Sequence, residues 1–223
     1  MLLTALLLFA TQIVTAPAQE KAATETRAVE SAQSTPSEAK PDKSTPDYYL
    51  NLRKKIVAAK DYNPYTLQMS EYVATELFLK TWEKDQEYFK ALQEIKPFLD
   101  SRPEAIEANR LVAEAFELMA KHETGETKTF AEEQGKRFRQ DYEGLINSIL
   151  TGKDGLTQET AFWVISIAEQ HEVMRHLKLK PGTQSLVQGK NGMYDFWETT
   201  DETGNKKNIY FDITHFMNGN TMK

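Results

Sequence analysis

The chain has no cysteine. Disulfide bonds, cysteine-ligated metal sites and a cysteine nucleophile are therefore excluded from every interpretation of the sequence. A folded region without disulfides must be stabilised by its own packed core. The side chains that can titrate near neutral pH or bind a metal ion through nitrogen are four histidines, His122, His171, His176 and His215.

Basic residues are fewer than acidic ones, 27 against 33, which gives a formal net charge of −6. Nucleic acids and anionic lipids are bound through basic surfaces. The charge balance therefore predicts that neither is a partner. Hydrophobic residues make up 40% of the sequence and charged residues 27%, which is ordinary usage for a soluble globular protein.

Residues 2–14 form an uncharged apolar stretch that ends in the small-x-small pattern Ala16-Pro17-Ala18. The stretch is shorter than the roughly 20 apolar residues of a membrane-spanning helix. We predict a signal peptide over 1–18, cleaved after Ala18, with no stable membrane insertion afterwards and a periplasmic or extracellular bacterial location. No Lys or Arg precedes Lys21, so two alternatives stay open: an uncleaved anchor, or a longer leader that starts upstream.

Residues 19–46 are rich in Ala, Ser, Thr, Glu, Lys and Pro, and contain no aromatic residue. Val29 is their only sizeable apolar side chain. Such a segment cannot bury enough surface to offset its chain entropy, so it is predicted to be a disordered linker. Aromatic residues begin at Tyr48, and we predict one folded domain over 47–223.

Apolar residues recur at helical spacing through residues 47–151. Thr45-Pro46-Asp47 is typical of a helix start, and Asn63-Pro64 is typical of a break between helices. Ser101 and Glu104 have the spacing of a capping box, which predicts that a helix starts there. Small residues and short connections predict a stack of helical hairpins similar to tetratricopeptide repeats.

The periodicity changes in residues 152–223. The β-prone run 161–167 predicts a strand, and 169–179 predicts one short helix. Alternating runs at 184–188, 193–199 and 208–214 predict three more strands, the first two joined by a hairpin at Asn191-Gly192. The fold class is therefore α+β, with helical hairpins followed by a small antiparallel β-sheet.

Four stretches of the C-terminal part carry a family resemblance: TGKDGLTQETAFWVIS (151–166), EQHEVMRHLKLKPGTQSLV (169–187), GMYDFWE (192–198) and NIYFDITHF (208–216). Together with the preceding helices they resemble an exported bacterial family catalogued as domain of unknown function 4919. The resemblance covers about residues 62–216 and is strongest over 151–216. It implies export and a helical-plus-sheet fold. It implies no activity, so no catalytic residue and no cofactor is carried over.

Aromatic and acidic residues gather on the predicted C-terminal hairpin, and we take six of them as candidate binding residues: Tyr194, Asp195, Trp197, Tyr210, Asp212 and His215. Asp195 and Asp212 are predicted on the same side of neighbouring strands, where two carboxylates could share a proton. The alternative is a solvated strand face.

No metal site is predicted. His171 and His176 are five residues apart, which does not place two ligands on one helix face. The turn at 153–155 could bind an anion through its backbone, although plain connections share its pattern. The basic run 136–139 is typical of a solvated helix face.

Two functions follow from these features. The first is a non-enzymatic interaction module that binds an unidentified envelope protein through an exposed apolar or concave surface. The second is a small-ligand-binding protein or hydrolase that uses Asp195, Asp212 and His215 in a deep pocket. Whether those three side chains converge discriminates between the two.

Overall fold

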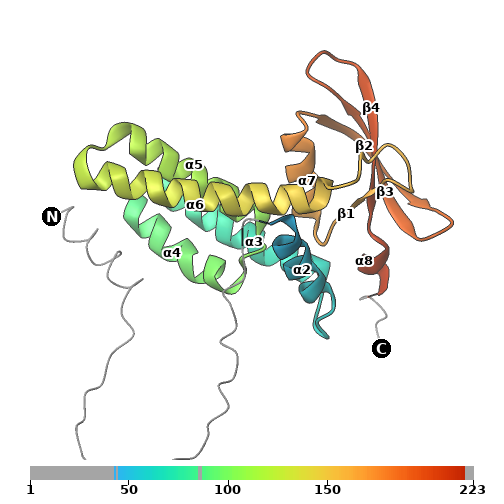
Figure 1. Ribbon diagram of the computed structural model, residues 1–223, viewed down its shortest axis with the longest axis horizontal. Helices are drawn as coiled ribbons and strands as arrows, with labels where there is room; N and C mark the ends of the chain where they lie inside the picture. The colour runs from blue at the N-terminus through green and yellow to red at the C-terminus, as the bar shows by residue number, and fades with distance from the viewer. Residues whose placement is uncertain (1–42, 44, 85–86, 219–223) are drawn as a thin grey trace, which may run out of the picture. The chain divides into compact units, whose positions relative to one another are not determined.

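Figure 1 shows the computed structural model of the chain, in which residues 43, 45–84 and 87–218 are described. The predicted signal peptide and almost all of the predicted linker lie outside these residues. The described part has helices in its N-terminal half and a sheet in its C-terminal half, as the α+β class predicts.

The N-terminal half consists of α2 (Pro46–Val57), α3 (Pro64–Leu79), a π-helical segment (Lys80–Lys84), α4 (Tyr88–Ser101), α5 (Ile106–His122) and α6 (Gly125–Leu150). The predicted start of α2 is confirmed, with Pro46 in the first turn, where its missing N–H costs nothing. The break before α3 is confirmed as well. There Asn63 caps the helix, because its side chain accepts hydrogen bonds from the backbone N–H groups of Tyr65 and Thr66.

The predicted capping box at Ser101 and Glu104 is wrong. Ser101 is the last residue of α4, and α5 begins five residues later, at Ile106. The Oε1 atom of the Glu71 carboxyl group of α3 accepts hydrogen bonds from the backbone N–H groups of Glu107 and Ala108, at 2.8 and 3.2 Å. A cap from a distant helix therefore replaces the local one, which the sequence pattern around Ser101 could not reveal.

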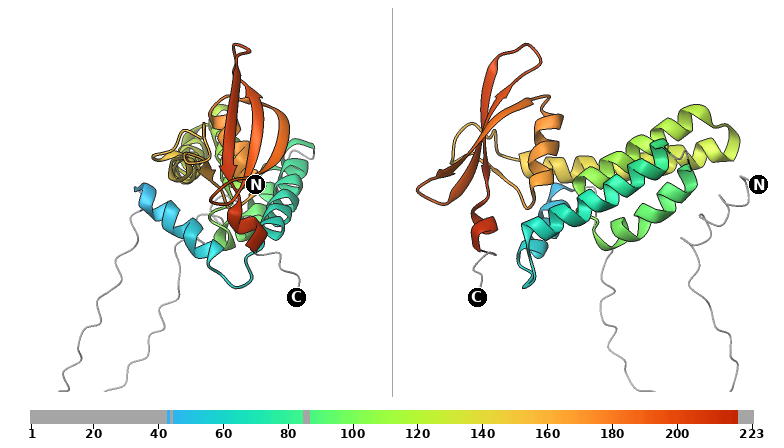
Figure 2. Two further views of the ribbon diagram at one scale, coloured as in Figure 1. Left: turned by 90° about the vertical axis from the view of Figure 1, so that its right-hand side faces the viewer. Right: turned by 180° about the vertical axis from the view of Figure 1, so that it is seen from behind.

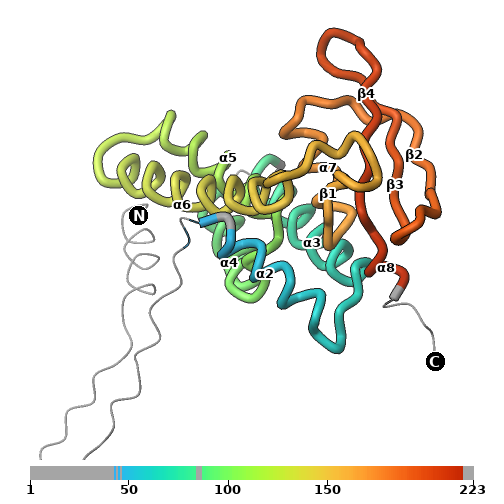
Figure 3. The backbone as a smooth tube through the Cα atoms, turned by 45° about the vertical axis from the view of Figure 1, so that its right-hand side comes forward, coloured from blue at the N-terminus to red at the C-terminus, as the bar shows by residue number. Residues whose placement is uncertain are grey.

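Helices α5 and α6 form a long antiparallel hairpin, which the tube in Figure 3 follows through its tip. Gly125 opens α6 with a positive φ of 61°, a conformation that favours glycine. Along the hairpin the Phe116 ring stacks on Phe138 with centroids 6.0 Å apart. Helix α2 crosses α6 at Gly144, where a Cβ atom would lie 2.0 Å from the Tyr49 ring.

The C-terminal half contains β1 (Phe162–Trp163), α7 (Ile167–His176), β2 (Lys180–Gln188), β3 (Met193–Thr200), β4 (Lys206–Asp212) and α8 (Thr214–Asn218). The strands lie in the order β1-β4-β3-β2. The predicted hairpin between β2 and β3 is confirmed. The sheet is mixed rather than purely antiparallel, because β1 pairs with β4 in parallel.

The predicted strand over 161–167 is largely wrong, since only Phe162 and Trp163 pair in the sheet. Ser166 ends the extended run because its hydroxyl accepts a hydrogen bond from the backbone N–H of Glu169 and caps α7. The β-branched Ile167 is then the first residue of a helix.

Helix α7 lies between the long helices and the sheet, as Figure 1 and the right-hand view of Figure 2 show. A single cluster of buried side chains joins all three layers. Its members come from α2, α5, α6, α7, the sheet and α8, and include Tyr49, Ile106, Leu145, Ile146, Val173, Met174, Trp197, Ile209, Phe211 and Phe216. The helical and sheet parts therefore share one core.

Candidate functional site

The six candidate residues of the C-terminal hairpin do not form one site. The pairing of β3 with β4 sets Asp195 opposite Phe211 and Tyr194 opposite Asp212. Side chains alternate between the two faces of a sheet, so Asp195 and Asp212 lie on opposite faces. The prediction that these two carboxylates share a side is wrong, and they cannot share a proton.

On the face that packs against α7, Asp195 and Trp197 are bound to Gln170. The Gln170 amide donates to Asp195 Oδ2 at 2.7 Å, and the Trp197 indole N–H donates to Gln170 Oε1 at 2.9 Å. All three side chains are buried. Their polar atoms are used within the fold, so this group attaches α7 to the sheet.

On the opposite face, Tyr194, Tyr210 and Asp212 have separate roles. Tyr194 is buried, and Tyr210 packs on Phe196 with ring centroids 4.9 Å apart. Asp212 accepts hydrogen bonds from the backbone N–H and hydroxyl of Thr214, at 3.0 and 2.7 Å. These contacts fix the end of β4 and the start of α8.

His215 lies in α8 among the aromatic rings of Tyr62, Trp163 and Phe216, with centroids 4.9–5.7 Å from its own. Burial lowers the pKa of His215 to about 4, and this outweighs the opposing charge of Asp212. Its Nε2 atom is buried and has no hydrogen-bond partner among the described residues. The neutral ring acts as an aromatic packing residue in this cluster.

The other residues that the sequence analysis considered as ligands also lie apart from one another. His171 packs edge-on against Trp197, while His176 is exposed near the end of α7. Asp154 accepts hydrogen bonds from the Leu156 backbone N–H and the Thr160 hydroxyl, which lower the pKa of the Asp154 carboxyl. The turn at 153–155, which the sequence analysis considered as an anion site, is therefore occupied by a carboxylate of its own. Within the described ranges no group of three His, Asp or Glu residues is placed to hold a metal ion.

Helix α7 buries two carboxylates that the sequence analysis missed. Glu169 forms a bidentate ion pair with Arg53 of α2, with N–O distances of 2.7 and 2.8 Å, and both side chains are almost fully buried. Arg53 also donates to the Trp163 carbonyl, and Glu169 accepts from the Ile165 backbone N–H. The only sequence signal is that Arg53 falls four residues after Tyr49, on the buried face of α2.

The second buried carboxylate of α7 is Glu172, whose two oxygens share the single Nε–H of Arg110 in α5, at 3.0 and 2.9 Å. Burial raises the pKa of Glu172, while the Arg110 charge acts against that shift. Both α7 carboxylates therefore have arginine partners inside the fold. We interpret the two pairs as structural ties between α7 and the long helices.

Helix α3 has the opposite distribution of polarity. Its buried side carries Pro64, Glu71, Thr75 and Phe78. Its exposed side carries five large apolar or aromatic residues, which we call the α3 face: Tyr65 (53% exposed), Met69 (56%), Tyr72 (51%), Val73 (59%) and Leu77 (47%). At about 100° per residue these five positions fall within an arc of roughly 140°.

A groove of about 710 Å³ follows the α3 face. Met69, Val73 and Leu77 line one side of it, and Phe98 and Glu94 of α4 line the other. Glu94 is the only charged residue among the described residues that line the groove, and its carboxylate accepts a hydrogen bond from Thr81 at 2.9 Å. The surface is thus largely apolar, and the groove is shallow and open to solvent, as suits a site that covers an apolar segment.

The sequence did carry a signal for this surface. Residues 64–79 place apolar side chains around the whole circumference of α3, whereas a surface helix normally has one apolar stripe. Only one side can face the core, so the other must be exposed or covered by something else.

A comparison with protein families matches residues 45–222 to a family described as "Domain of unknown function (DUF4919)". No curated protein and no solved structure matches the chain. Separately, none of the helices in the described residues is both long enough and apolar enough to cross a membrane. The family match spans the helices and the sheet, and its description names no activity.

Proposed function

The chain belongs to the DUF4919 family, and we propose that its domain is an exported protein-interaction module that binds an amphipathic helix of a partner protein on the α3 face. The observation that carries the proposal is the exposure of five large apolar side chains on one helix, beside an apolar groove.

The spacing of the α3 face supports a helical partner. Positions 65, 69, 72, 73 and 77 follow the i, i+4, i+7, i+8 pattern by which two helices pack along a common seam. From Tyr65 to Leu77 the face spans about 18 Å at 1.5 Å per residue, or more than three helical turns. A short amphipathic helix therefore has the length and the periodicity to cover it.

The composition of the face supports binding over catalysis. Aromatic residues and methionine are enriched at protein interfaces, and the α3 face contains two tyrosines and one methionine. The polar residues on the buried side of α3 are used within the fold: Glu71 caps α5, and Thr75 donates to the Tyr72 carbonyl. The exposed side thus offers contact area rather than reactive groups.

The test uses an 18-residue amphipathic peptide as probe, with leucines at heptad seam positions and Glu and Lys elsewhere. An isomer of the same composition, with its leucines spread around the helix, is the peptide control. We expect the amphipathic peptide alone to bind, and to shift the methyl NMR signals of Met69, Val73 and Leu77.

The protein variants are matched in charge and in number. Met69→Glu/Val73→Glu should weaken binding at least tenfold, whereas Leu118→Glu/Leu156→Glu, at exposed leucines elsewhere, should leave it unchanged. Equal binding of both peptides, or equal loss in both variants, would contradict the proposal. A dimer in sedimentation that Met69→Glu/Val73→Glu dissociates would identify a second copy as the occupant instead.

Export is the second part of the proposal, and it is supported by the apolar stretch 2–14 and the cleavage pattern at Ala16-Pro17-Ala18. N-terminal sequencing of the full-length protein recovered from the envelope of its native host should begin at Gln19. A protein that retains Met1 and fractionates with the membrane would show an uncleaved anchor, and recovery from the cytosol would contradict export.

A further inference from the structure

The two edges of the sheet are closed to different degrees. At one edge β1 contributes only two residues, and beyond them the Gly155 carbonyl accepts a hydrogen bond from the Tyr210 backbone N–H at 2.8 Å. At the other edge lies β2, which is nine residues long and pairs only with β3 among the described residues. One edge of the β2 backbone is therefore available for pairing.

Edge strands of natural proteins are normally protected by charges, prolines or bulges. In β2 such protection is confined to the first residues, where Pro181 precedes a register shift that ends at Gln184. Residues 184–188 pair regularly with β3 and carry neither charge nor proline. Every residue of β2 except Val187 is exposed, and Leu186 is 58% exposed. The regular half of the strand is thus an unprotected template for a further strand.

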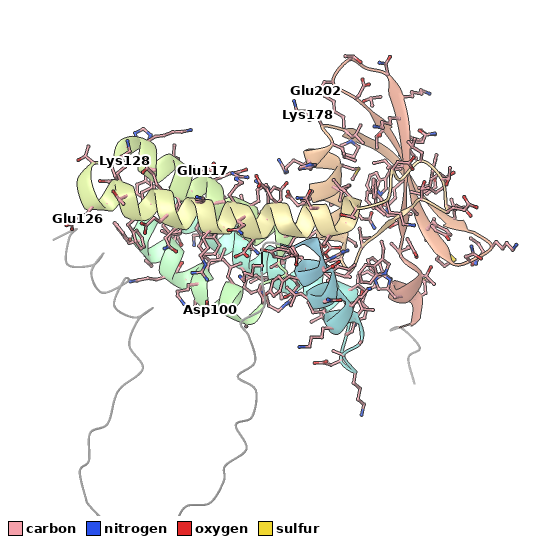
Figure 4. All side chains as sticks on the ribbon, viewed as in Figure 1. Asp100, Glu117, Glu126, Lys128, Lys178 and Glu202 are labelled. Atoms are coloured by element: carbon pink, nitrogen blue, oxygen red, sulfur yellow. The ribbon has the colours of Figure 1, made fainter. Side chains whose placement is uncertain are left out.

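The charge around β2 differs from that of the chain as a whole. Residues 178–192 contain three lysines and no acidic residue, although the net charge of the chain is −6. Lys178 Nζ lies 3.5 Å from Glu202 Oε2, and both side chains are labelled in Figure 4. Lys180 and Lys190 remain exposed at the two ends of the uncharged run.

This charge pattern disfavours a second copy of the same strand. Antiparallel pairing of residues 184–188 with themselves would set Lys190 of one copy opposite Gly182 of the other, two residues from Lys180. Like charges would then be neighbours at both ends of the pairing. A strand with an uncharged centre and acidic ends would instead meet a lysine at each end.

We propose that β2 is a second binding surface, which takes up an extended peptide segment of another protein, uncharged in its middle and acidic at its ends, as an additional strand. Main-chain hydrogen bonds to the outer edge of residues 184–188 supply the binding, and Lys180 and Lys190 select the flanking charges. This surface is separate from the α3 face, and it does not depend on the function proposed for that face.

The experiment uses the nine-residue peptide acetyl-Glu-Glu-Thr-Val-Thr-Val-Thr-Glu-Glu-amide and the whole domain. We expect the amides of residues 184–188 to shift in NMR spectra, and those on the outer edge of the strand to become protected from hydrogen exchange. A peptide with lysine in place of each glutamate is the charge control. A peptide with every backbone nitrogen of its five central residues methylated is the strand control, because it has no N–H donor on either edge of that segment.

The double variant Lys180→Glu/Lys190→Glu should reverse the preference, with at least tenfold weaker binding of the acidic peptide and tighter binding of the lysine peptide. Met69→Glu/Val73→Glu should bind the acidic peptide as the unmodified domain does, which separates this test from that of the α3 face.

Four results would overturn the proposal: no binding at millimolar peptide, equal binding of the methylated peptide, amide shifts away from β2, or an unchanged charge preference in the lysine variant. Protection of residues 184–188 that grows with protein concentration, without peptide, would show that a second copy covers the edge.

Discussion

Helices α7 and α3 place polar and apolar residues in opposite ways. Helix α7 buries Glu169, Gln170 and Glu172, and each has hydrogen-bond partners from another element. Helix α3 exposes the five large side chains of the α3 face, which have no comparable cover within the described residues. Burial in this domain therefore follows the availability of partners as much as polarity. The buried charges of α7 are accounted for by contacts within the fold, whereas the α3 face is exposed among the described residues and is the surface for which we propose a partner.

The largest expected effect comes from breaking a buried pair of α7. Arg53→Ala leaves the Glu169 carboxylate buried without its partner, so we expect about 3–5 kcal/mol lower free energy of unfolding. Urea denaturation followed by circular dichroism measures it.

The matched control for that variant is Arg139→Ala, which removes a bidentate but partly exposed pair with Glu117. We expect this variant to lower the free energy of unfolding by about 1 kcal/mol or less. The variant Arg53→Met/Glu169→Gln, which removes both charges, should recover part of the loss. If Arg53→Ala and Arg139→Ala lower the free energy of unfolding equally, the buried pair does not tie α7 to the long helices more strongly than an exposed pair would.

A pH-dependent effect, which approaches the Arg53→Ala effect in size only near pH 8, concerns the ionisable residue on the buried side of α3. Burial raises the pKa of Glu71 from 4.5 to about 8, although the backbone N–H groups of Ala108 and Glu107 favour the charged form. The folded domain therefore holds this proton more tightly than the unfolded chain. The contribution to stability is complete below pH 4.5, and it is lost as the pH rises towards 8.

Glu71→Gln keeps an acceptor for the two N–H groups but cannot ionise. The unmodified domain should lose stability relative to this variant between pH 4.5 and 8, by at most about 1.4 kcal/mol per pH unit. Urea unfolding at several pH values measures the difference. If the free energies of unfolding of the two proteins change with pH in parallel, Glu71 is already ionised in the folded domain. The N-terminus of α5 would then affect the pKa of Glu71 more strongly than burial does.

The smallest expected effect on the free energy of unfolding comes from comparing the exposed and the buried side of α3. Met69→Ser and Val73→Ser should each change the free energy of unfolding by about 0.5 kcal/mol or less, because both side chains are exposed. Phe78→Ala, on the buried side of the same helix, should cost about 3–5 kcal/mol. Thermal and urea unfolding of the three variants measures the loss at the two exposed positions and the loss at the buried one. A loss of several kcal/mol at Met69 or Val73 would mean that the α3 face is part of the core.

Local chemistry predicted much of the secondary structure. Pro46 and Asn63-Pro64 set the starts of α2 and α3, because cap geometry depends on neighbouring residues alone. The β2–β3 hairpin was predicted as well, but its connection is the four residues 189–192, and neither Asn191 nor Gly192 has the positive φ of a two-residue Asn-Gly turn. The prediction failed where a distant residue supplied the deciding contact. Glu71 capped α5 in place of Ser101, and the partners of α7 were not visible in any short window.

The prediction of the candidate site was wrong for a related reason. Both faces of β3 carry aromatic residues, so its alternation does not say which face is buried. The register with β4 decided that, and it set Asp195 against α7 and Asp212 on the other side. A shift of one residue in such pairing exchanges the faces, and residue types alone do not fix it.

By itself the sequence determined the absence of disulfides, the α+β order of elements, the family, and a helix α3 with more apolar surface than one core can cover. Only the tertiary structure decided which side of α3 packs inward, which charges are buried in pairs, and which edge of the sheet is left unpaired by the described residues. Local patterns fix backbone conformation within a few residues, whereas burial is set by elements that are far apart in the chain and compete for the same core.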